Sequence, residues 1–270
     1  MARPDRFTVR GMLALAVVFG AAALGEWRRP LRRRVRPLRE RLLVNAVLVG
    51  LAGAVVQGLV FPASAGAARW AERRGIGLMR WLPLPRPLRL LAGFLLLDWG
   101  TYVWHRLNHR VPFLWRFHLV HHTDLDLDVT TAFRFHAGEL LMAVAVRAGQ
   151  AAALGVSARQ MLVYEIAMQS AAAFHHSNWR LPRALEDGLL RVVVTPRMHG
   201  IHHSVVESET NSNWSVILTW WDRLHGTLRL GIPHETLTIG VPGYRDPAEL
   251  GVARLLALPF VEDRPAWPRR

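Results

Sequence analysis

Eight of the thirteen histidines of this 270-residue chain lie in three short boxes. Two boxes have the pattern His-x-x-His-His, and the first has the pattern His-x-x-x-His. On a helix, residues three and four apart lie about 5–6 Å apart at Cβ, so each box can direct its imidazoles to one point. Imidazole suits iron, zinc, copper and nickel. The sequence therefore predicts a metal site held by His105 and His109, by His118, His121 and His122, and by His199, His202 and His203.

The number of candidate ligands indicates more than one ion. A zinc site is complete with four ligands, so eight histidines are most simply shared by two ions. Because the chain contains no cysteine, thiolate sites and iron–sulfur clusters are excluded. The boxes contain no carboxylate, and the nearest ones, Asp98 and Asp124, are expected to orient ligands through hydrogen bonds. Such a dinuclear site is compatible with metal-assisted hydrolysis or, with iron, with O2 activation.

Long apolar segments indicate that the site belongs to a membrane protein. Residues 11–25 predict an anchor rather than a signal peptide, because an arginine run follows directly. Residues 42–65 carry no charge and are long enough to cross a hydrocarbon core of about 30 Å. A further crossing is expected at residues 88–104. The apolar stretches 140–156 and 161–174 are interrupted by polar groups and predict a hairpin that dips part-way into the bilayer.

The net charge of +14 comes from arginine alone among the strong bases, since the chain has no lysine. Eight arginines lie between Arg28 and Arg41, and the positive-inside rule places this loop in the cytoplasm. Counting crossings from this loop brings the histidine boxes to the cytoplasmic side. Because the arginines flank apolar runs, we expect anionic lipid headgroups as their counter-charge and no nucleic acid partner.

Beyond the boxes, several shorter motifs support a family resemblance. These motifs are Phe-Arg-Phe-His136, His-Ser-Asn178, Trp221-Asp222-Arg and Gly226-Thr. Together with the boxes and their spacing, they resemble the fatty acid hydroxylase superfamily, the sterol desaturase family, over about residues 90–229. The resemblance implies an all-α, integral-membrane, multi-pass helical bundle with a histidine-held dimetal site at the cytosolic face. It also implies O2-dependent C–H hydroxylation or desaturation of a lipid, such as a sterol or a fatty acyl chain.

The resemblance also extends the ligand set. It implies that His136 and His176 are ligands besides the eight box histidines. The family pattern His-Ser-Asn selects His176 over its neighbour His175, which is expected not to bind metal. His225 is expected to pack against other side chains, and His234 is expected to be solvated. Ala137 stands where relatives often carry proline, so the turn at His136 is less constrained.

The expected cofactors are two iron ions (Fe2+/Fe3+) with O2 as cosubstrate, and zinc as a replacement. A separate electron donor is implied, either cytochrome b5-like, a ferredoxin or a flavoprotein. Two alternatives remain: a membrane lipid hydrolase with two zinc ions, and a non-enzymatic metal-binding or transport protein. The expected organisation is membrane anchor helices and an interfacial segment over 1–87, a catalytic domain over 88–229 and a peripheral tail over 230–270.

Overall fold

The computed structural model describes residues 6–261 and 264–267, and these residues form helices and loops without a β-strand. The prediction of an all-α fold is confirmed. The α-helices are α1 (Arg6–Arg28), α2 (Leu38–Val55), α3 (Phe61–Arg74), α4 (Leu78–Trp81), α5 (Arg86–Arg110), α6 (Pro112–His122), α7 (Ala137–Leu154), α8 (Ala158–His176), α9 (Arg183–Leu189), α10 (Pro196–His202), α11 (Glu207–Thr210), α12 (Trp220–Leu224) and α13 (Val252–Ala257). A π-helix, η1 (Val56–Val60), and the 3-10 turns η2 (Thr131–Phe133), η3 (Pro247–Glu249) and η4 (Leu258–Phe260) complete the set.

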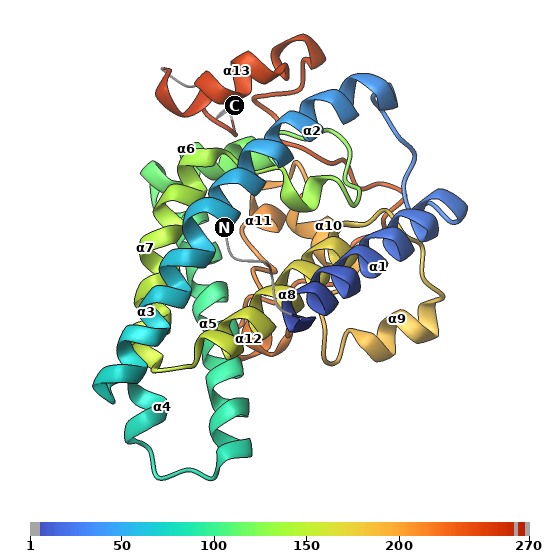
Figure 1. Cartoon of the computed structure of the whole chain (residues 1–270). Coiled ribbons are helices and arrows are strands. Elements are labelled where there is room, and N and C mark those ends of the chain that lie inside the picture. The colour runs from blue at the N-terminus through green and yellow to red at the C-terminus, as the bar shows by residue number, and fades with distance from the viewer. Residues whose placement is uncertain (1–5, 262–263, 268–270) are drawn as a thin grey trace.

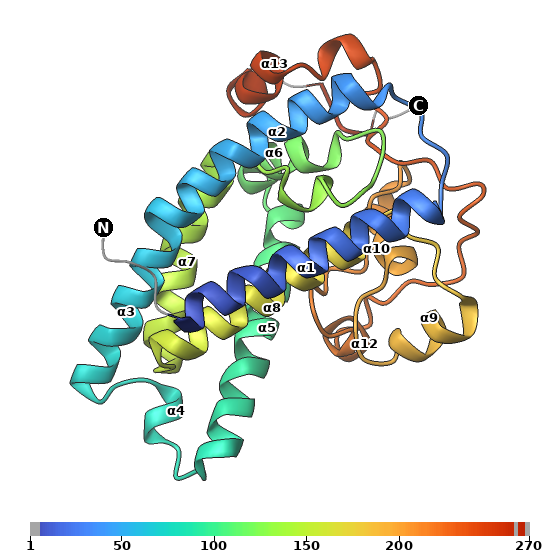
Figure 2. The same cartoon turned by 45° about the vertical axis from the view of Figure 1, so that its right-hand side comes forward.

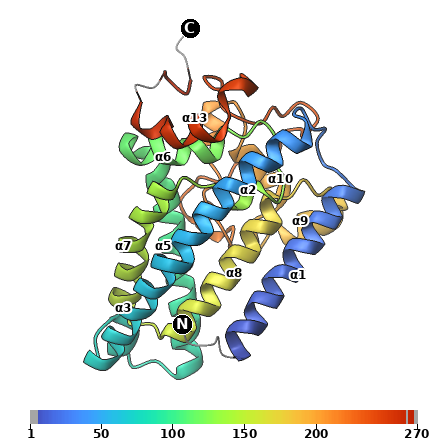
Figure 3. The same cartoon turned by 45° about the horizontal axis from the view of Figure 1, so that its top comes forward.

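The long helices lie side by side in one bundle (Figure 1 and Figure 3). Helix α3 packs along α7 and α8, and α1 packs along the outer side of α8 (Figure 2). Helix α2 continues through η1 into α3 without a break, and this long helix ends at Gly75. The φ of Gly75 is +65°, a left-handed conformation that glycine adopts without a Cβ clash. Helices α6 and α13 lie at the end of the bundle that is uppermost in Figure 1.

Among the described residues, three segments are long and apolar enough to cross a membrane: Val9–Arg28, Leu38–Trp81 and Ala137–Leu154. The first two contain the segments predicted at 11–25 and 42–65. Large apolar side chains on their outer faces are exposed, among them Val17 and Leu43. Exposed apolar side chains on a helix surface are stable when lipid rather than water surrounds them. The prediction of an integral-membrane protein is confirmed.

One predicted membrane segment needs correction, and another is not tested. Residues 88–104 lie in α5, which is not among the helices that meet the length and composition of a span, so the crossing expected there stays a prediction. Arg89 and Asp98 interrupt its apolar run, and its far end carries the first histidine box. In contrast, α7 meets the length and composition of a span, although its sequence predicted one arm of a shallow hairpin. The difference arises because the single arginine and single acidic residue of α7 leave an otherwise apolar helix of 18 residues.

The segment after residue 229 contributes to the hydrophobic core. Val241, Leu250 and Leu255 are buried in one cluster with Leu48 of α2 and Leu119 of α6. The 3-10 turn η4 packs on α6, and α13 packs on α2. This segment therefore covers the second histidine box from outside, next to the end of α2.

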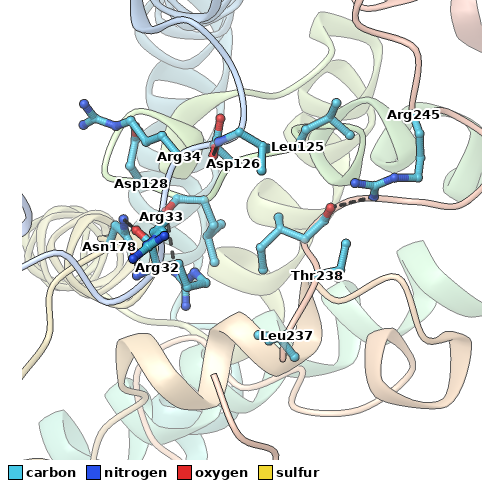
Figure 4. Close-up of a pocket in the computed structure, with 13 residues that line it drawn as sticks. Arg32, Arg33, Arg34, Leu125, Asp126, Asp128, Asn178, Leu237, Thr238 and Arg245 are labelled. Atoms are coloured by element: carbon cyan, nitrogen blue, oxygen red, sulfur yellow. Dashed lines mark hydrogen bonds between the residues drawn. The ribbon is translucent and has the colours of Figure 1, made fainter. Parts of the chain in front are cut away.

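The arginine loop between α1 and α2 is also part of the fold. Arg41 is buried and pairs with Asp124 at 2.8 Å and with Asp128, both in the loop after α6. Asp126 of the same loop accepts the backbone N–H groups of Val35 and Arg36, at 2.9 and 3.0 Å. A pocket of about 100 Å³ lies where the loop after α6 meets the arginines and the 237–245 segment; Figure 4 shows the residues that line it. Part of the arginine charge is therefore balanced inside the protein rather than at a lipid surface.

Candidate metal centre

Four helices bring the histidine boxes together. His105 and His109 lie one turn apart at the end of α5, and the chain then turns sharply at Val111, whose extended backbone precedes Pro112. Proline at the first helical position starts α6 without losing a hydrogen bond. Helix α6 ends in the second box, and α10 carries the third. Helix α8 ends at His176, so one histidine of the His-Ser-Asn motif joins the boxes.

The histidines form two groups, each compact enough to hold one ion. In each group, one nitrogen from every member lies within 4.8 Å of those of all the others. The first group takes ligands from all three boxes: His105, His109, His118, His122 and His202. The second group is His121, His176, His199 and His203. Adjacent residues of one box therefore belong to different groups, because neighbours on a helix point in directions about 100° apart.

The second group has the nitrogen spacing of a metal site. Nε2 of His176 lies 3.1 Å from Nε2 of His121 and 3.0 Å from Nε2 of His199. Nε2 of His203 lies 3.1 Å from Nε2 of His199. Nitrogens bound at about 2.0–2.1 Å to one ion lie about 3 Å from one another. His176 Nδ1 donates to the carbonyl oxygen of Ala172 at 2.8 Å, which leaves the lone pair on Nε2, facing the group.

Backbone carbonyls also orient two imidazoles of the first group through hydrogen bonds to Nδ1. Nδ1 of His105 donates to the carbonyl of Trp214 at 2.9 Å, and Nδ1 of His202 donates to the carbonyl of Ser212 at 2.8 Å. Because a carbonyl only accepts, these imidazoles present Nε2 as a lone pair. Nε2 of His202 and both ring nitrogens of His109 and His122 are buried and have no hydrogen-bond partner among the described residues. Buried nitrogens of this kind need a partner, and a metal ion supplies one.

Burial favours the neutral form of several of these imidazoles. It lowers the pKa of His202 to about 3, against the opposing hydrogen bond to Ser212, and neighbouring histidines lower it further. Burial also places the pKa of His122 well below its ordinary value, and His203 adds to this effect. The pKa of His121 is lowered well below its ordinary value by burial and by His176. Neutral imidazole is the form that binds metal, so the donor set fits metal ions.

Nine of the ten histidines predicted as ligands lie in the two groups. The exception is His136, which begins α7. Its Nδ1 accepts the backbone N–H of Gly138 at 2.9 Å, and its Nε2 donates to the carbonyl of Leu256 at 3.1 Å. Both nitrogens of His136 are therefore engaged away from the groups. The Nδ1–Gly138 contact makes His136 the N-cap of α7.

The structure places the remaining histidines as follows. His175 is outside both groups, although its ring centroid lies 4.1 Å from that of His199. His225 stacks on Tyr102 at 4.9 Å and accepts from Trp99 Nε1 at 3.0 Å, in agreement with a packing role. The expectation that His234 is solvated is wrong. It is 5% exposed, because Arg32 Nη1 lies 3.1 Å from its Nδ1 and the two side chains cover Gly200 in box three.

The carboxylate that contacts a group histidine is Glu139, which the sequence analysis missed. Its Oε1 lies 2.9 Å from Nδ1 of His118 and 3.3 Å from Nδ2 of Asn108. Its Oε2 is buried without a partner among the described residues. Glu139 lies three residues after His136, in the first turn of an apolar helix. An acidic residue in such a membrane segment is a signal that was available in the sequence.

Asp98 and Asp124, the carboxylates expected to orient ligands, have other partners. Asp98 accepts from Trp221 Nε1 at 2.7 Å and from the backbone N–H of Leu218 at 3.1 Å, so it positions the segment at α12. Asp124 binds Arg41, as described above. Asp124 follows box two directly, but its backbone has left α6 and turns toward α2. Asp124 is therefore close to box two in the sequence but makes no hydrogen bond to a histidine of either group.

An apolar cavity of about 280 Å³ ends at the histidines. One stripe of side chains from each of α2–η1, α5, α7 and α8 forms its wall. His105, His118, His121, His176 and His199 line it together with apolar side chains such as Phe135 and Leu140. Gly53 and Gln57 also line it and are exposed, so the cavity reaches the surface of the protein beside the long helix.

Fold and site define a membrane-embedded, histidine-rich metalloprotein with an apolar cavity at its metal groups. Residues 90–227, just over half of the chain, match the family model for fatty acid hydroxylase. The chain therefore belongs to the fatty acid hydroxylase family, and the predicted family is confirmed. The matched residues contain all nine histidines of the two groups and also Glu139.

Similar proteins act on lipids. An ornithine lipid hydroxylase from Rhizobium tropici is 30% identical over 176 residues, covering 65% of this chain and 51% of that protein. A cholesterol 25-hydroxylase from Rattus norvegicus is 28% identical over 210 residues, covering 76% and 69%. A human alkylglycerol monooxygenase is 26% identical over 148 residues, covering 54% and 32%. The chain thus spans about half the length of the first of these relatives and a third of the last. No significant match was found among solved structures.

Proposed function

We propose that this protein is a membrane-bound, non-haem diiron oxygenase that hydroxylates or desaturates a lipid in an O2-dependent reaction. The observation that carries the proposal is that histidines of both groups line one apolar cavity. The names of the relatives, a hydroxylase of ornithine lipid, hydroxylases of cholesterol and alkylglycerol monooxygenases, support lipid oxygenation over lipid hydrolysis.

The residues proposed to hold one ion are His105, His109, His118, His122 and His202, and those for the other are His121, His176, His199 and His203. When bound, two iron ions supply O2 activation, which the protein side chains cannot perform. Zinc fits the same nitrogen ligands and can replace iron.

The protein residues bind and orient the reactants. The apolar wall holds a hydrocarbon chain against the histidine groups and excludes water from them. Glu139 accepts a hydrogen bond from the protonated Nδ1 of His118 and so fixes the orientation of that ring. The carbonyls of Trp214 and Ser212 do the same for His105 and His202. Rigid backing of this kind keeps each lone pair directed at its group before a metal binds.

Two further parts of the proposal concern the surroundings of the site. The arginine loop of residues 28–41 favours the cytoplasmic side for the histidine groups. Electrons would then come from a separate cytoplasmic donor, either cytochrome b5-like, a ferredoxin or a flavoprotein. Anionic lipid headgroups are the proposed partners of the exposed arginines, such as Arg33 and Arg34.

The proposal is tested by metal content and by turnover together. Protein extracted from membranes without chelator should hold about two metal ions per chain, because nine ligands exceed the four of one zinc-type site. Iron-loaded protein in lipid nanodiscs, given O2 and a reductant, should convert a lipid to a product with one more oxygen or two fewer hydrogens. His202→Ala should lose metal and turnover, while the control His225→Phe should keep both. A metal content near one that is unchanged in His202→Ala would contradict the dimetal site. Hydrolysis without O2 would support the zinc hydrolase instead.

A further inference from the structure

A polar cluster lies in the cavity wall, away from the histidines. Arg147 of α7 and Glu165 of α8 form a buried ion pair in which Arg147 Nε donates to Glu165 Oε1 at 2.8 Å. Arg147 Nη1 also donates to Gln150 Oε1 at 2.6 Å and to Thr101 Oγ1 at 3.2 Å. All four of these side chains line the same cavity as the histidine groups. None of their hydrogen bonds involves a histidine of either group.

The rise of 1.5 Å per residue along a helix gives the distance between this cluster and the metal groups. Glu139, which backs His118, precedes Arg147 by eight residues on α7, which is about 12 Å along the helix axis. Glu165 precedes His176 by eleven residues on α8, which is about 16 Å along that axis. Thr101 precedes His105 by four residues on α5, which is about 6 Å along that axis. The cluster therefore lies about 6 Å from the histidines along α5 and about 12–16 Å from them along α7 and α8.

The ion pair joins α7 to α8 inside the bundle. Arg147 lies within a helix apolar enough to span the membrane, and ionisable groups there are costly and usually functional. A buried pair is seldom more stable than apolar residues of the same volume, so stability alone does not explain it. The pair is neutral as a unit, and the neighbouring amides carry no charge.

Two glutamines on the cavity wall are available to a ligand. Gln169 lies one turn along α8 from Glu165, on the histidine side, and its amide has no hydrogen bond among the described residues. Gln57 lies on the π-helix η1, where the cavity reaches the surface of the protein. π-helical turns inside α-helices are frequent at functional sites, because they redirect the side chains of one turn.

We propose that this cluster binds the polar end of the lipid substrate, and that this end is a neutral hydrogen-bonding group such as a hydroxyl or an amide. The Arg147–Glu165 pair disfavours a charged group, since a carboxylate would compete with Glu165 and an ammonium group would compete with Arg147. Gln169 and Gln57 offer both donors and acceptors to a neutral group. With its polar end held there, the lipid presents to the histidines a carbon about 6–16 Å along its chain. This inference rests on the proposed function in taking a lipid as the substrate.

The orientation is tested without turnover by photo-crosslinking in nanodiscs. The probes are two forms of 1-dodecanol, one with a diazirine beside the hydroxyl and one with a diazirine at the methyl end. We expect the hydroxyl-end probe to label peptides around Arg147 and Gln169, and the methyl-end probe to label peptides around Trp104 and Phe135. The reversed pattern, or no labelling of cavity residues by either probe, would overturn the proposal.

Variants test the polar contact itself. Gln169→Leu should weaken binding of the alcohol about three- to tenfold, the range for one lost hydrogen bond of about 0.5–1.5 kcal/mol. Binding of dodecane should not weaken. The matched control is Met168→Leu, a neighbouring cavity residue without a polar group, which should change neither ligand. Equal loss for both ligands in Gln169→Leu would show a packing role and contradict the assignment. Since crosslinking and binding need no metal or O2, correct labelling with failed turnover would count against the proposed function alone.

Discussion

At the scale of single residues, hydrogen bonds behind the rings decide which nitrogens can bind metal. Backbone carbonyls take the Nδ1 protons of His105, His176 and His202, and a carboxylate takes that of His118. Each of these imidazoles therefore presents Nε2. These hydrogen-bond partners hold the ligands in position, and losing one costs about 10–100-fold in metal affinity or activity.

Glu139→Gln tests this positioning role. The amide can still accept from Nδ1 of His118 but carries no charge, so we expect metal to be lost at about 10–100-fold lower chelator concentration. The matched control is Glu72→Gln, which removes an exposed carboxylate that pairs with Arg80. The readout is metal retained during chelator titration, with the unfolding temperature of the metal-free protein as a second measurement. A lowered unfolding temperature with unchanged metal retention would mean that Glu139 is only structural.

The adjacent histidines of the His-Ser-Asn motif allow a second test. His176 belongs to a group and His175 does not, so His176→Ala should lose most bound metal and turnover. His175→Ala should keep most of both, with a defect smaller than the 10–100-fold loss that removal of a ligand's hydrogen-bond partner causes. Equal and complete loss in both variants would show that His175 also binds, or that the choice between them is wrong.

At the scale of elements, the loop after box two connects the metal site to the membrane helices. It binds α2 through Arg41, and Glu26 of α1 accepts the backbone N–H groups of Val129 and Asn178 at 3.0 Å each. One carboxylate thus holds both the loop after box two and the motif after α8. The two N-terminal helices are therefore expected to stabilise the site, although they lie outside the family match.

The Arg41–Asp124 pair gives a pH-dependent stability. Burial alone would raise the pKa of Asp124, but Arg41 and Arg134 lower it from 3.8 to about 2. A lowered pKa in the folded state stabilises the fold above pH 3.8, and this stability is lost as the pH falls through about 2. The shift corresponds to about 2–3 kcal/mol.

Asp124→Asn should therefore lower the free energy of unfolding at pH 7 by about this amount and flatten its dependence on pH between about 4 and 2. The measurement is thermal unfolding in detergent across that range, with Asp187→Asn in α9 as an exposed control. An unchanged pH profile would contradict a stabilising role for the charged carboxylate.

At the scale of the whole molecule, the proposed orientation in the membrane can be tested with single cysteines, because the natural chain has none. Arg33, Arg73 and Glu207 are exposed and lie in the arginine loop, at the end of α3 and next to box three. We expect a membrane-impermeant maleimide added outside intact cells to label Arg73→Cys alone. Labelling of Glu207→Cys from outside would overturn the cytoplasmic orientation and the route proposed for electrons. Labelling of all three after lysis is the control for reactivity.

The sequence by itself determined the helical class, the membrane location and the family, and it predicted ten ligand histidines, of which nine lie in the two groups. Spacing of three and four residues places imidazoles on one helix face whatever the fold, and long uncharged segments have no other stable surroundings than lipid. It also selected His176 over His175 from the motif, and the structure places His176 in a group.

Only the tertiary structure decided how the histidines divide and what lies around them. Boxes two and three are each divided between the groups, whereas both histidines of box one belong to the first group, because α5, α6, α8 and α10 bring different faces of the boxes together. His136 was grouped with the ligands by its motif, yet Gly138 and Leu256 engage its ring, and the second of these is distant in sequence. The roles of Glu139 and of the Arg147–Glu165 pair also depend on partners in other helices. A buried polar group is defined by its partners, and those partners come from other helices.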